Sequence, residues 1–395
     1  MNILVISQYY YPEPFKINEI CEEMVGRGHQ ITVLTGLPNY PEGEIFEEYK
    51  GFNIEKAEML NGVKVIRVPI KPRKKGSINL VKNYISYVTE ANKRLKKLDS
   101  VFDLVFVYQL SPILMAIPAI KFHKRHRIPL ILYCLDLWPE SIKTIGINEG
   151  NIIFKVLRRL SKAIYKSCDK ICVSSPSFID YLASELSLKA TEIEFIPQHG
   201  EEEYLEISSS NIHNPLVITY AGNIGKAQDF TTLLRTIKEK DLNVHVRIIG
   251  NGSMLEELEQ MIFKLDLIEK ISLEGRKNKC ELKQLFNETD VLYITLKNNS
   301  LLGNTLPTKL QTYMAVGKPI LANIGGDAKK VIEESSCGLV SDFGDIDKLA
   351  TNIKKISENY MEYCVRGRLY FEKNFTLAKV VDEFENLIKG IKEEY

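Results

Sequence analysis

The sequence has few of the features that mark membrane-spanning, disulfide-stabilised or metal-binding proteins. Its longest apolar run, Pro112–Ile120, is well short of the ~18 residues of a membrane span, and no basic, apolar leader opens the chain. The seven cysteines are odd in number and none are spaced as C-x-x-C, which predicts reduced thiols in the core. The six histidines form no cluster with metal-ligand spacing. These absences predict a cytoplasmic protein without a bound metal.

Net charge is also nearly absent, at +1, although the charges are unevenly placed. The first half of the chain is basic and the second half acidic, and the basic excess gathers in Lys71–Lys97. Two apolar stripes run through that segment at helical spacing, which fits a helix lying on an anionic membrane and equally a buried helix with charged ends. The composition is otherwise that of a globular protein, and its 395 residues suffice for two large or three small domains.

Short apolar runs alternate along the chain with longer segments of helical periodicity, the pattern of a parallel α/β sheet. The strands predicted in the first half are Asn2–Ser7, Gln30–Thr35, Val63–Val68, Leu104–Val107, Pro129–Tyr133, Lys170–Ser174 and Glu194–Pro197. Those of the second half are Leu216–Tyr220, Val244–Ile249, Lys270–Leu273, Val291–Thr295 and Pro319–Asn323.

The expected fold class is α/β, with two doubly wound Rossmann-like domains facing a central cleft. The amino-terminal domain covers 1–200, a polar linker covers 201–215, and the carboxyl-terminal domain covers 216–374. An amphipathic helix at 375–395 needs an apolar groove, for which the amino-terminal domain is a candidate.

Ligands of open parallel sheets bind outside the carboxyl ends of the strands, so loops that follow strands are the candidate sites. In the first half these loops are aromatic and proline-rich, and tyrosine rings combine contact area with a hydroxyl, which suits sugars. His199 also follows a strand, and Asp136 offers a carboxylate for orienting hydroxyls or for acid/base chemistry. The candidate ligand-binding residues of this half are Tyr10, Tyr11, Glu13, Asn39, Trp138, Glu140 and His199.

In the second half, two loops have the character of anion sites. Tyr220–Gln228 follows a strand and opens a helix, with glycines that permit close backbone approach and Lys226 to add charge. Gly303–Lys309 precedes another helix, where free amides and Lys309 converge. Gly250-Asn251-Gly252 carries a weaker signal, typical of a plain strand-to-helix turn.

These loops make most of the chain similar to the retaining glycosyltransferases of family 4, which have the GT-B fold, and among them to bacterial polysaccharide and O-antigen transferases of the WbuB group. The segments that carry the resemblance are Ser7–Pro14, Gly28–Pro41, Asp136–Ser141, Gly222–Gln228 and Pro307–Pro319.

The resemblance implies a nucleotide-sugar donor, commonly UDP-linked, on the carboxyl-terminal domain, an acceptor on the amino-terminal domain, and no obligatory cofactor. It places Lys226 and Gln228 at the diphosphate, with Asn223 where many members have arginine, and Asp136 beside the reacting sugar. Two glutamates that many members carry eight positions apart are here Asn304 and Thr312, which can still hydrogen-bond a sugar and a ribose. The implied donor-binding residues are Gly222, Asn223, Gly225, Gln228, Arg276, Lys277, Leu306, Lys309 and Thr312.

The expected function is transfer of a sugar, with retention, from a nucleotide-diphosphate donor to a lipid-linked or oligosaccharide acceptor in capsule, O-antigen or exopolysaccharide synthesis. Asp136, Lys226 and Asn304 are the catalytic candidates. Two other functions share this architecture: a sugar-nucleotide epimerase, and a non-catalytic nucleotide-sugar-binding partner of another transferase. A nicotinamide dehydrogenase is disfavoured because no G-x-G-x-x-G follows the first strand, and no nucleic-acid partner is expected.

Overall fold

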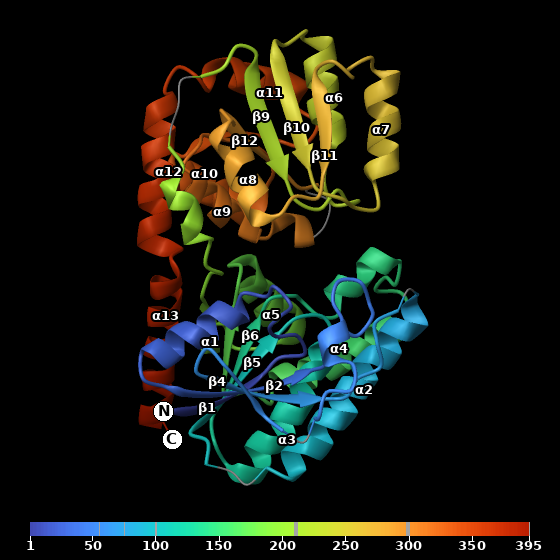
Figure 1. Cartoon of the computed structure of the whole chain (residues 1–395), viewed down its shortest axis with the longest axis vertical. Helices are drawn as coiled ribbons and strands as arrows, with labels where there is room; N and C mark the ends of the chain where they lie inside the picture. The colour runs from blue at the N-terminus through green and yellow to red at the C-terminus, as the bar shows by residue number, and fades with distance from the viewer. Residues whose placement is uncertain (55, 75, 99–100, 209–211, 298–300, 395) are drawn as a thin grey trace. The chain divides into compact units, whose positions relative to one another are not determined.

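The protein forms two compact units, shown in Figure 1. The structure is a computed structural model that describes residues 1–54, 56–74, 76–98, 101–208, 212–297 and 301–394. Unit 1 comprises Met1–Pro197 and Val380–Tyr395, and unit 2 comprises Gln198–Lys379. Lys75 of the basic segment and residues 209–211 of the predicted linker lie outside the described residues.

Unit 1 is built on a sheet whose strands follow the order β3-β4-β2-β1-β5-β6-β7-β8. Only β3 runs antiparallel to its neighbour; the other described pairings are parallel. The strands are β1 (Asn2–Ile6), β2 (Gln30–Gly36), β3 (Glu58–Leu60), β4 (Val63–Val68), β5 (Leu104–Gln109), β6 (Leu130–Cys134), β7 (Lys170–Val173) and β8 (Ile193–Phe195). The predicted doubly wound architecture is confirmed.

Strand β3 is absent from the sequence prediction, although the sequence carries its signal. Asn61 and Gly62 join β3 to β4, and both have positive φ, 49° and 81°. Asn-Gly is the dipeptide that favours a two-residue hairpin turn, because both positions require left-handed backbone.

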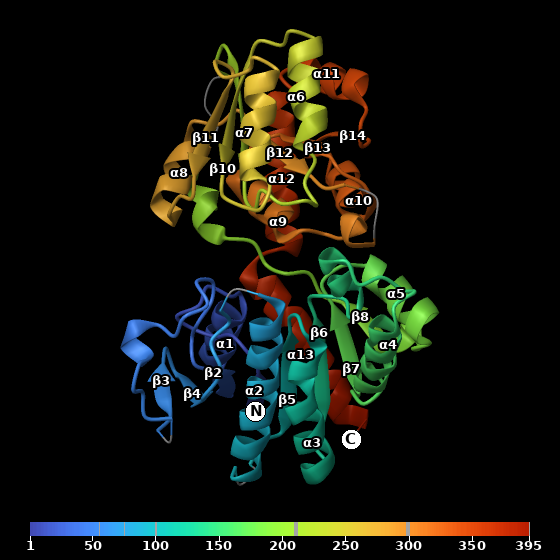
Figure 2. The ribbon, with the colours of Figure 1, turned by 90° about the vertical axis from the view of Figure 1, so that its right-hand side faces the viewer.

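Helices cover both faces of the unit 1 sheet. Helices α2 and α3 lie side by side in front of the sheet in Figure 2, with α13 behind it. Among the described residues, no helix combines the length and apolarity needed to cross a membrane. The helices are α1 (Ile17–Gly26), α2 (Ser77–Lys96), α3 (Ile117–His126), α4 (Ile152–Tyr165), α5 (Ser177–Leu186) and α13 (Leu377–Glu394), with 3-10 turns η1 (Glu47–Tyr49), η2 (Ile113–Ala116), η3 (Glu140–Ile145) and η4 (Ala190–Glu192).

The end of the chain packs on unit 1 through the apolar face of α13. The Phe384 ring meets Phe106 and Tyr133 edge to face, at centroid distances of 5.2 and 5.0 Å. Beside this contact, Arg27 Nη1 donates to Asp382 at 2.6 Å and to Glu385 at 3.1 Å. Hydrogen bonds from His29 and Arg27 hold the pKa of the Glu385 carboxyl below its usual value. Residues 380–391 therefore complete the core of unit 1.

Unit 2 has a parallel sheet in the order β11-β10-β9-β12-β13-β14. Its strands are β9 (Leu216–Ala221), β10 (Val244–Ile249), β11 (Ile271–Gly275), β12 (Val291–Thr295), β13 (Ile320–Asn323) and β14 (Gly338–Ser341), the last not predicted. Its helices are α6 (Phe230–Glu239), α7 (Leu255–Lys264), α8 (Lys279–Asn287), α9 (Thr308–Val316), α10 (Gly326–Ser335), α11 (Ile346–Lys355) and α12 (Tyr360–Asn374), with 3-10 turns η5 (Glu202–Glu206) and η6 (Leu301–Asn304).

Two apolar cores lie on the two faces of this sheet, and β12 contributes to both. Tyr293 belongs to the core under α6, α7 and α11, whereas Leu292 and Ile294 belong to the core under α9 and α12. This alternation follows from the two-residue period of a strand. All seven cysteines are free thiols, and Cys280 on α8 is exposed, which corrects the expectation that they all lie in the core.

The predicted linker is folded over its first part. Tyr204 and Ile207 are buried in the core under α9, and the Tyr204 ring lies 5.3 Å from Phe286. Turn η5 packs directly on α9. The segment differs from a solvated linker because two of its residues, Tyr204 and Ile207, are buried in the core although its composition is mostly polar.

Replacing Phe384 by alanine is predicted to destabilise unit 1 by about 3–5 kcal/mol, because it removes a fully buried ring from the core. Hydrogen exchange read by mass spectrometry should show faster exchange in β5 and β6. The matched control is Phe263→Ala on α7, where the ring is 74% exposed and little change is expected. Equal exchange in both variants would contradict the packing role of Phe384.

Candidate functional site

In unit 2, the topology places two predicted loops beside each other. From β9 the chain winds outward through β10 and β11 on one side, and through β12 to β14 on the other. The loops after β9 and β12 therefore flank the point where the winding direction reverses, which is where open parallel sheets bind ligands. These loops contain Gly222–Gln228 and the segment that leads into Lys309.

Backbone contact shapes the loop after β9. A side chain on Gly250 would place its Cβ 1.8 Å from the Gly222 carbonyl oxygen, and one on Gly252 would lie 2.1 Å from that of Ile224. Both Gly222 and Gly250 have positive φ, at 150° and 141°. The Gly250-Asn251-Gly252 turn thus supports the loop, a role that its weak sequence signal did not reveal.

Lys309 is the cation that this loop surrounds. Its Nζ lies 3.7 Å from the centre of the Tyr220 ring, and a Cβ on Gly222 would lie 2.5 Å from it. Desolvation lowers the pKa of the Lys309 ammonium from 10.5 to about 7. An anion at this position would hold the lysine in its charged form, so the arrangement favours binding of a phosphate group.

The other predicted residues of this loop divide into exposed and bracing groups. Lys226 and Asn223 are exposed, and the Asn223 carbonyl accepts a hydrogen bond from Tyr220 Oη at 2.6 Å. Gln228 Oε1 accepts the Gly225 amide at 2.9 Å, so this side chain braces the loop. Lys226 is therefore the residue of this loop that presents an exposed charge to solvent.

The loop after β11 contributes two more predicted residues at the same sheet edge. Arg276 is exposed, while Lys277 Nζ lies 3.7 Å from a Glu274 carboxylate oxygen. The Gly275 carbonyl accepts the Gly250 amide at 2.8 Å, which joins this loop to the glycine turn.

Asn304, Leu306 and Thr312 lie around the start of α9. A Cβ on Gly326 would lie 2.3 Å from the Asn304 backbone, so the loops after β12 and β13 touch there. Leu306 is buried in the core. The Thr312 hydroxyl donates to the carboxylate of Glu201, a residue that the sequence analysis did not select.

In unit 1, the winding direction reverses between β1 and β5. The loop after β1 is the aromatic segment, in which Tyr9 stacks on Phe15 at 5.1 Å and Tyr40 packs against both rings. Tyr11 is 47% exposed. Of the predicted tyrosines, Tyr11 is thus placed to contact a ligand.

Tyr10, Glu13 and Asn39, which were predicted to contact an acceptor, are all buried. Glu13 Oε1 accepts the amides of Asn39 and Tyr40 at 2.9 and 2.8 Å, which ties the loop after β1 to the loop after β2. Burial raises the pKa of Glu13 to about 7, against the effect of these amide bonds. These buried side chains therefore hold the loops after β1 and β2 in place.

A buried arginine that the sequence analysis missed supports the same loops. Arg67 on β4 donates to Glu58 at 2.6 Å and to the Tyr11 carbonyl at 2.6 Å, and its guanidinium lies over the Tyr49 ring. The sequence carried a signal for this residue, because an arginine within an apolar strand is expected to be buried. A buried guanidinium requires several hydrogen-bond acceptors nearby.

Asp136, Trp138 and Glu140 follow β6. Asp136 is half-buried, accepts the Ser111 amide at 3.2 Å, and has a pKa raised by desolvation. Trp138 is largely buried and donates to Ser111 Oγ at 2.8 Å. Glu140 is buried and accepts the Tyr181 hydroxyl at 2.8 Å.

His199 was predicted on the amino-terminal domain, but it belongs to unit 2 and is buried there. Its Nδ1 lies 3.1 Å from the Gly200 carbonyl oxygen. Within the described ranges, no group of three or more histidine, cysteine, aspartate or glutamate side chains has the arrangement of a metal site.

Comparison with known families divides the chain at nearly the same place as the structure. Residues 17–198 match the family described as Glycosyltransferase Family 4, and residues 204–374 match Glycosyl transferases group 1. The chain therefore carries both domains of these families and belongs to the glycosyltransferases of GT-B fold.

Relatives and solved structures agree with this assignment. WbjE, a glycosyltransferase of Pseudomonas aeruginosa, is 25% identical over 62% of this chain, and the match spans 64% of WbjE, which is less than two thirds of its length. The colanic acid biosynthesis glycosyl transferase WcaI of Escherichia coli is 21% identical over 80% of this chain and 82% of its own. A sucrose-phosphate synthase from Thermosynechococcus elongatus shares the fold with a TM-score of 0.77 at 13% identity, with all of both chains covered. Anabaena HepE, solved with UDP-glucose, gives a TM-score of 0.70 at 14% identity over 99% of this chain and all of HepE.

The Lys309 ammonium is predicted to titrate near pH 7, because the Tyr220 ring and the glycine loop remove water from it. After reductive ¹³C-methylation, one lysine resonance should titrate near that pH by NMR. It should vanish in Lys309→Met and persist in the control Lys240→Met, which removes an exposed ion pair with Asp347. If the resonance lost in Lys309→Met titrates above pH 9, the ammonium is not desolvated.

Proposed function

We propose that the protein transfers a sugar from a nucleotide-diphosphate donor, UDP-linked, with retention of configuration, to a lipid-linked or oligosaccharide acceptor in the assembly of a surface polysaccharide. The observation that carries this proposal is the desolvated Lys309 ammonium against the glycine loop at the switch point of unit 2. The names of relatives in colanic acid and amylovoran biosynthesis support the polysaccharide role. HepE, crystallised with UDP and with UDP-glucose, supports the donor class.

The chemistry that the chain supplies is stabilisation of the leaving diphosphate. Lys309 and Lys226 provide positive charge, and the amides at the start of α9 point toward the same region. As the glycosidic bond to the donor breaks, negative charge grows on the diphosphate, and these groups stabilise it without rearranging. Asn304 lies beside the same helix start and is proposed to hydrogen-bond the donor sugar.

The acceptor is proposed to bind unit 1 at the edge that holds Tyr11 and Asp136. Asp136 has a raised pKa, so it can accept a proton from an attacking hydroxyl more readily than an ordinary aspartate. Tyr11 offers an exposed ring and hydroxyl on the loop that Arg67 and Glu13 hold in place.

Lys226→Ala is predicted to lower kcat about a hundredfold, because it removes a group that stabilises charge only as the diphosphate leaves. UDP release from a UDP-sugar would be measured with a lipid-linked acceptor. Lys240→Ala is the control, since that lysine is exposed on unit 2 and pairs with Asp347. An unchanged rate in Lys226→Ala would contradict the assignment.

The same assay distinguishes two other functions of this fold. Donor consumption without any acceptor would indicate a sugar-nucleotide epimerase. Tight UDP binding by calorimetry with no turnover on any acceptor would indicate a non-catalytic partner of another transferase. Asn304 and Thr312, which are uncharged, are the residues that favour this last outcome.

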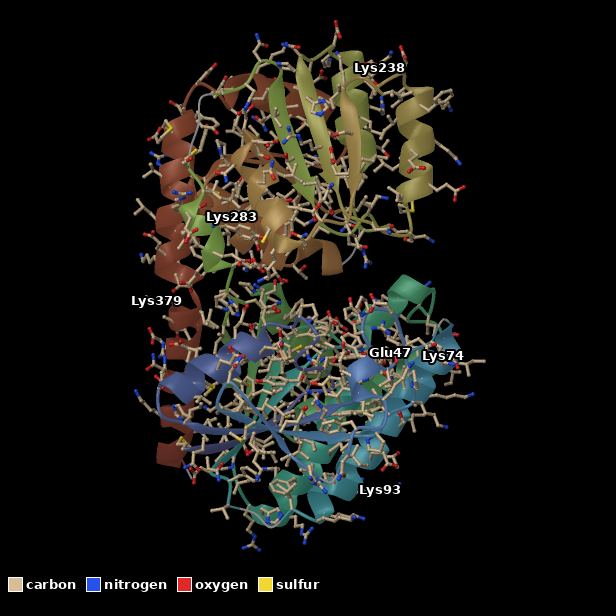
Figure 3. All side chains as sticks on the ribbon, viewed as in Figure 1. Glu47, Lys74, Lys93, Lys238, Lys283 and Lys379 are labelled. Atoms are coloured by element: carbon tan, nitrogen blue, oxygen red, sulfur yellow. The ribbon has the colours of Figure 1, made fainter. Side chains whose placement is uncertain are left out.

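We further propose that α2 holds unit 1 on an anionic membrane. One stripe of α2 is buried and includes Tyr87 and Ala91, whereas Ile78, Val81 and Ile85 are 70%, 52% and 55% exposed on the opposite side. Lys93 on α2 and Lys74 just before it, both labelled in Figure 3, are exposed and pair with Glu90 and Glu44. Apolar side chains flanked by lysines fit the interface of an anionic bilayer.

Helix α4 presents a second face of the same character. Ile152, Ile153 and Val156 are at least half exposed, and α4 contains five basic and no acidic residues in its described sequence and its cap. Both α2 and α4 pack on η2, so the two helices flank one turn of unit 1.

The triple variant Ile78→Ser, Val81→Ser, Ile85→Ser is predicted to lose most binding to phosphatidylglycerol vesicles, because it removes the apolar part of the contact. Sedimentation with vesicles measures this, and added salt should release the wild-type protein. The control is Lys238→Glu on α6, an exposed lysine labelled in Figure 3. Equal binding of the wild type to phosphatidylcholine vesicles would contradict the electrostatic part of the proposal.

A further inference from the structure

Three polar side chains lie on the first turns of α9 and point to two different neighbours. Lys309 reaches the glycine loop and the Tyr220 ring. Thr308 Oγ1 accepts a hydrogen bond from Gln198 Nε2 at 3.3 Å, and Thr312 donates to the Glu201 carboxylate and to the Thr308 carbonyl. The segment 198–201 therefore runs along the start of α9 and adds a carboxylate to it.

This segment is held firmly in place. The Gly200 amide donates to the Phe375 carbonyl at 2.9 Å. A Cβ on Gly200 would lie 2.5 Å from the Phe371 ring and 3.0 Å from the Gln311 carbonyl, so only glycine allows the chain to approach α9 this closely. Glu201, the next residue, is half-buried, and its carboxylate is fixed by the Thr312 hydroxyl. The position of the carboxylate is thus built into the packing of unit 2.

Helix geometry relates this carboxylate to the cation of the site. Lys309 and Thr312 are three residues apart, so they are neighbours on the surface of α9, with Cβ atoms ~5–6 Å from each other. In a nucleoside diphosphate, a diphosphate held at Lys309 continues directly into a ribose. The Thr312–Glu201 pair is the polar group that lies next to Lys309, on the side of segment 198–201. A carboxylate has two acceptor oxygens, which suits the two adjacent hydroxyls of a ribose.

We propose that Glu201 binds the ribose hydroxyls of the nucleotide donor, and that Thr312 positions its carboxylate. The inference rests on the proposed function, since it places the ribose beyond a diphosphate at Lys309. The proposal assigns the recognition of a ribonucleotide to a residue that lies just after the chain passes from unit 1 to unit 2. The sequence analysis predicted this residue only as the start of a linker.

The test compares three probes by calorimetry: UDP, 2′-deoxyuridine diphosphate and inorganic pyrophosphate. The wild type is expected to bind UDP about tenfold or more tightly than the deoxy compound, as for loss of a hydrogen bond to a charged group. In Glu201→Gln this preference should shrink to about threefold or less, with pyrophosphate affinity unchanged. Glu203→Gln is the control, because that carboxylate is exposed and pairs with Lys279.

Thr312→Val should reduce the same preference by a smaller factor, because the carboxylate remains but loses its fixed position. If the wild type and Glu201→Gln show the same preference for UDP, the assignment of Glu201 is overturned while the donor site stands. Loss of pyrophosphate binding in Glu201→Gln would overturn it too, as a general disruption of unit 2. If the wild type binds none of the three probes, the proposed donor site itself fails, and the assignment of Glu201 fails with it.

Discussion

The close approach of two glycine backbones in unit 2 is the constraint on which the candidate donor site depends. Gly250 presses on the Gly222 carbonyl, and no side chain fits between them. This contact sets the path of the loop after β9 and leaves beside Gly222 the space that the Lys309 ammonium enters. A lysine so placed is costly to keep charged without an anion, which is why its pKa falls. The proposed anion site is therefore shaped first by backbone geometry and then by charge.

In unit 1, the loops of the candidate acceptor site are fixed by buried side chains rather than by close backbone contact. These loops are tied together by side chains that lie beneath them, above all Glu13 and Arg67, which bind backbone groups of neighbouring loops. Buried charged groups of this kind are expensive unless every hydrogen bond is made, so they specify one loop arrangement. What remains for a ligand is the outer surface of these loops, where Tyr11 lies.

Much of the fold was predictable because apolar periodicity reports burial directly. The bounds of β4, β10 and β12 agree with those expected from the sequence. Strands β3 and β14, of three and four residues, were not predicted, although β7, β8 and β13 are equally short and were. The site was less predictable, because a polar residue after a strand looks the same whether it binds a ligand or the backbone of a neighbouring loop. Glu13 and Asn39 bind the backbone of neighbouring loops. Glu201 was invisible for another reason: its partner Thr312 is 111 residues away, and only the folded chain brings them together.

The docking of α13 has a consequence for how this protein is made. Unit 1 is discontinuous in the sequence, since residues 380–391 supply Phe384 and its apolar neighbours to a core that otherwise ends at Pro197. During synthesis on the ribosome, the face of β5 and β6 that receives Phe384 therefore stays uncovered until the whole of unit 2 has been translated. Unit 2 is contiguous and has no such delay. Unit 1 is therefore the first unit to be synthesised and the last to complete its core. A chimera that exchanges the amino-terminal domain must also carry the matching carboxyl-terminal segment, residues 380–391.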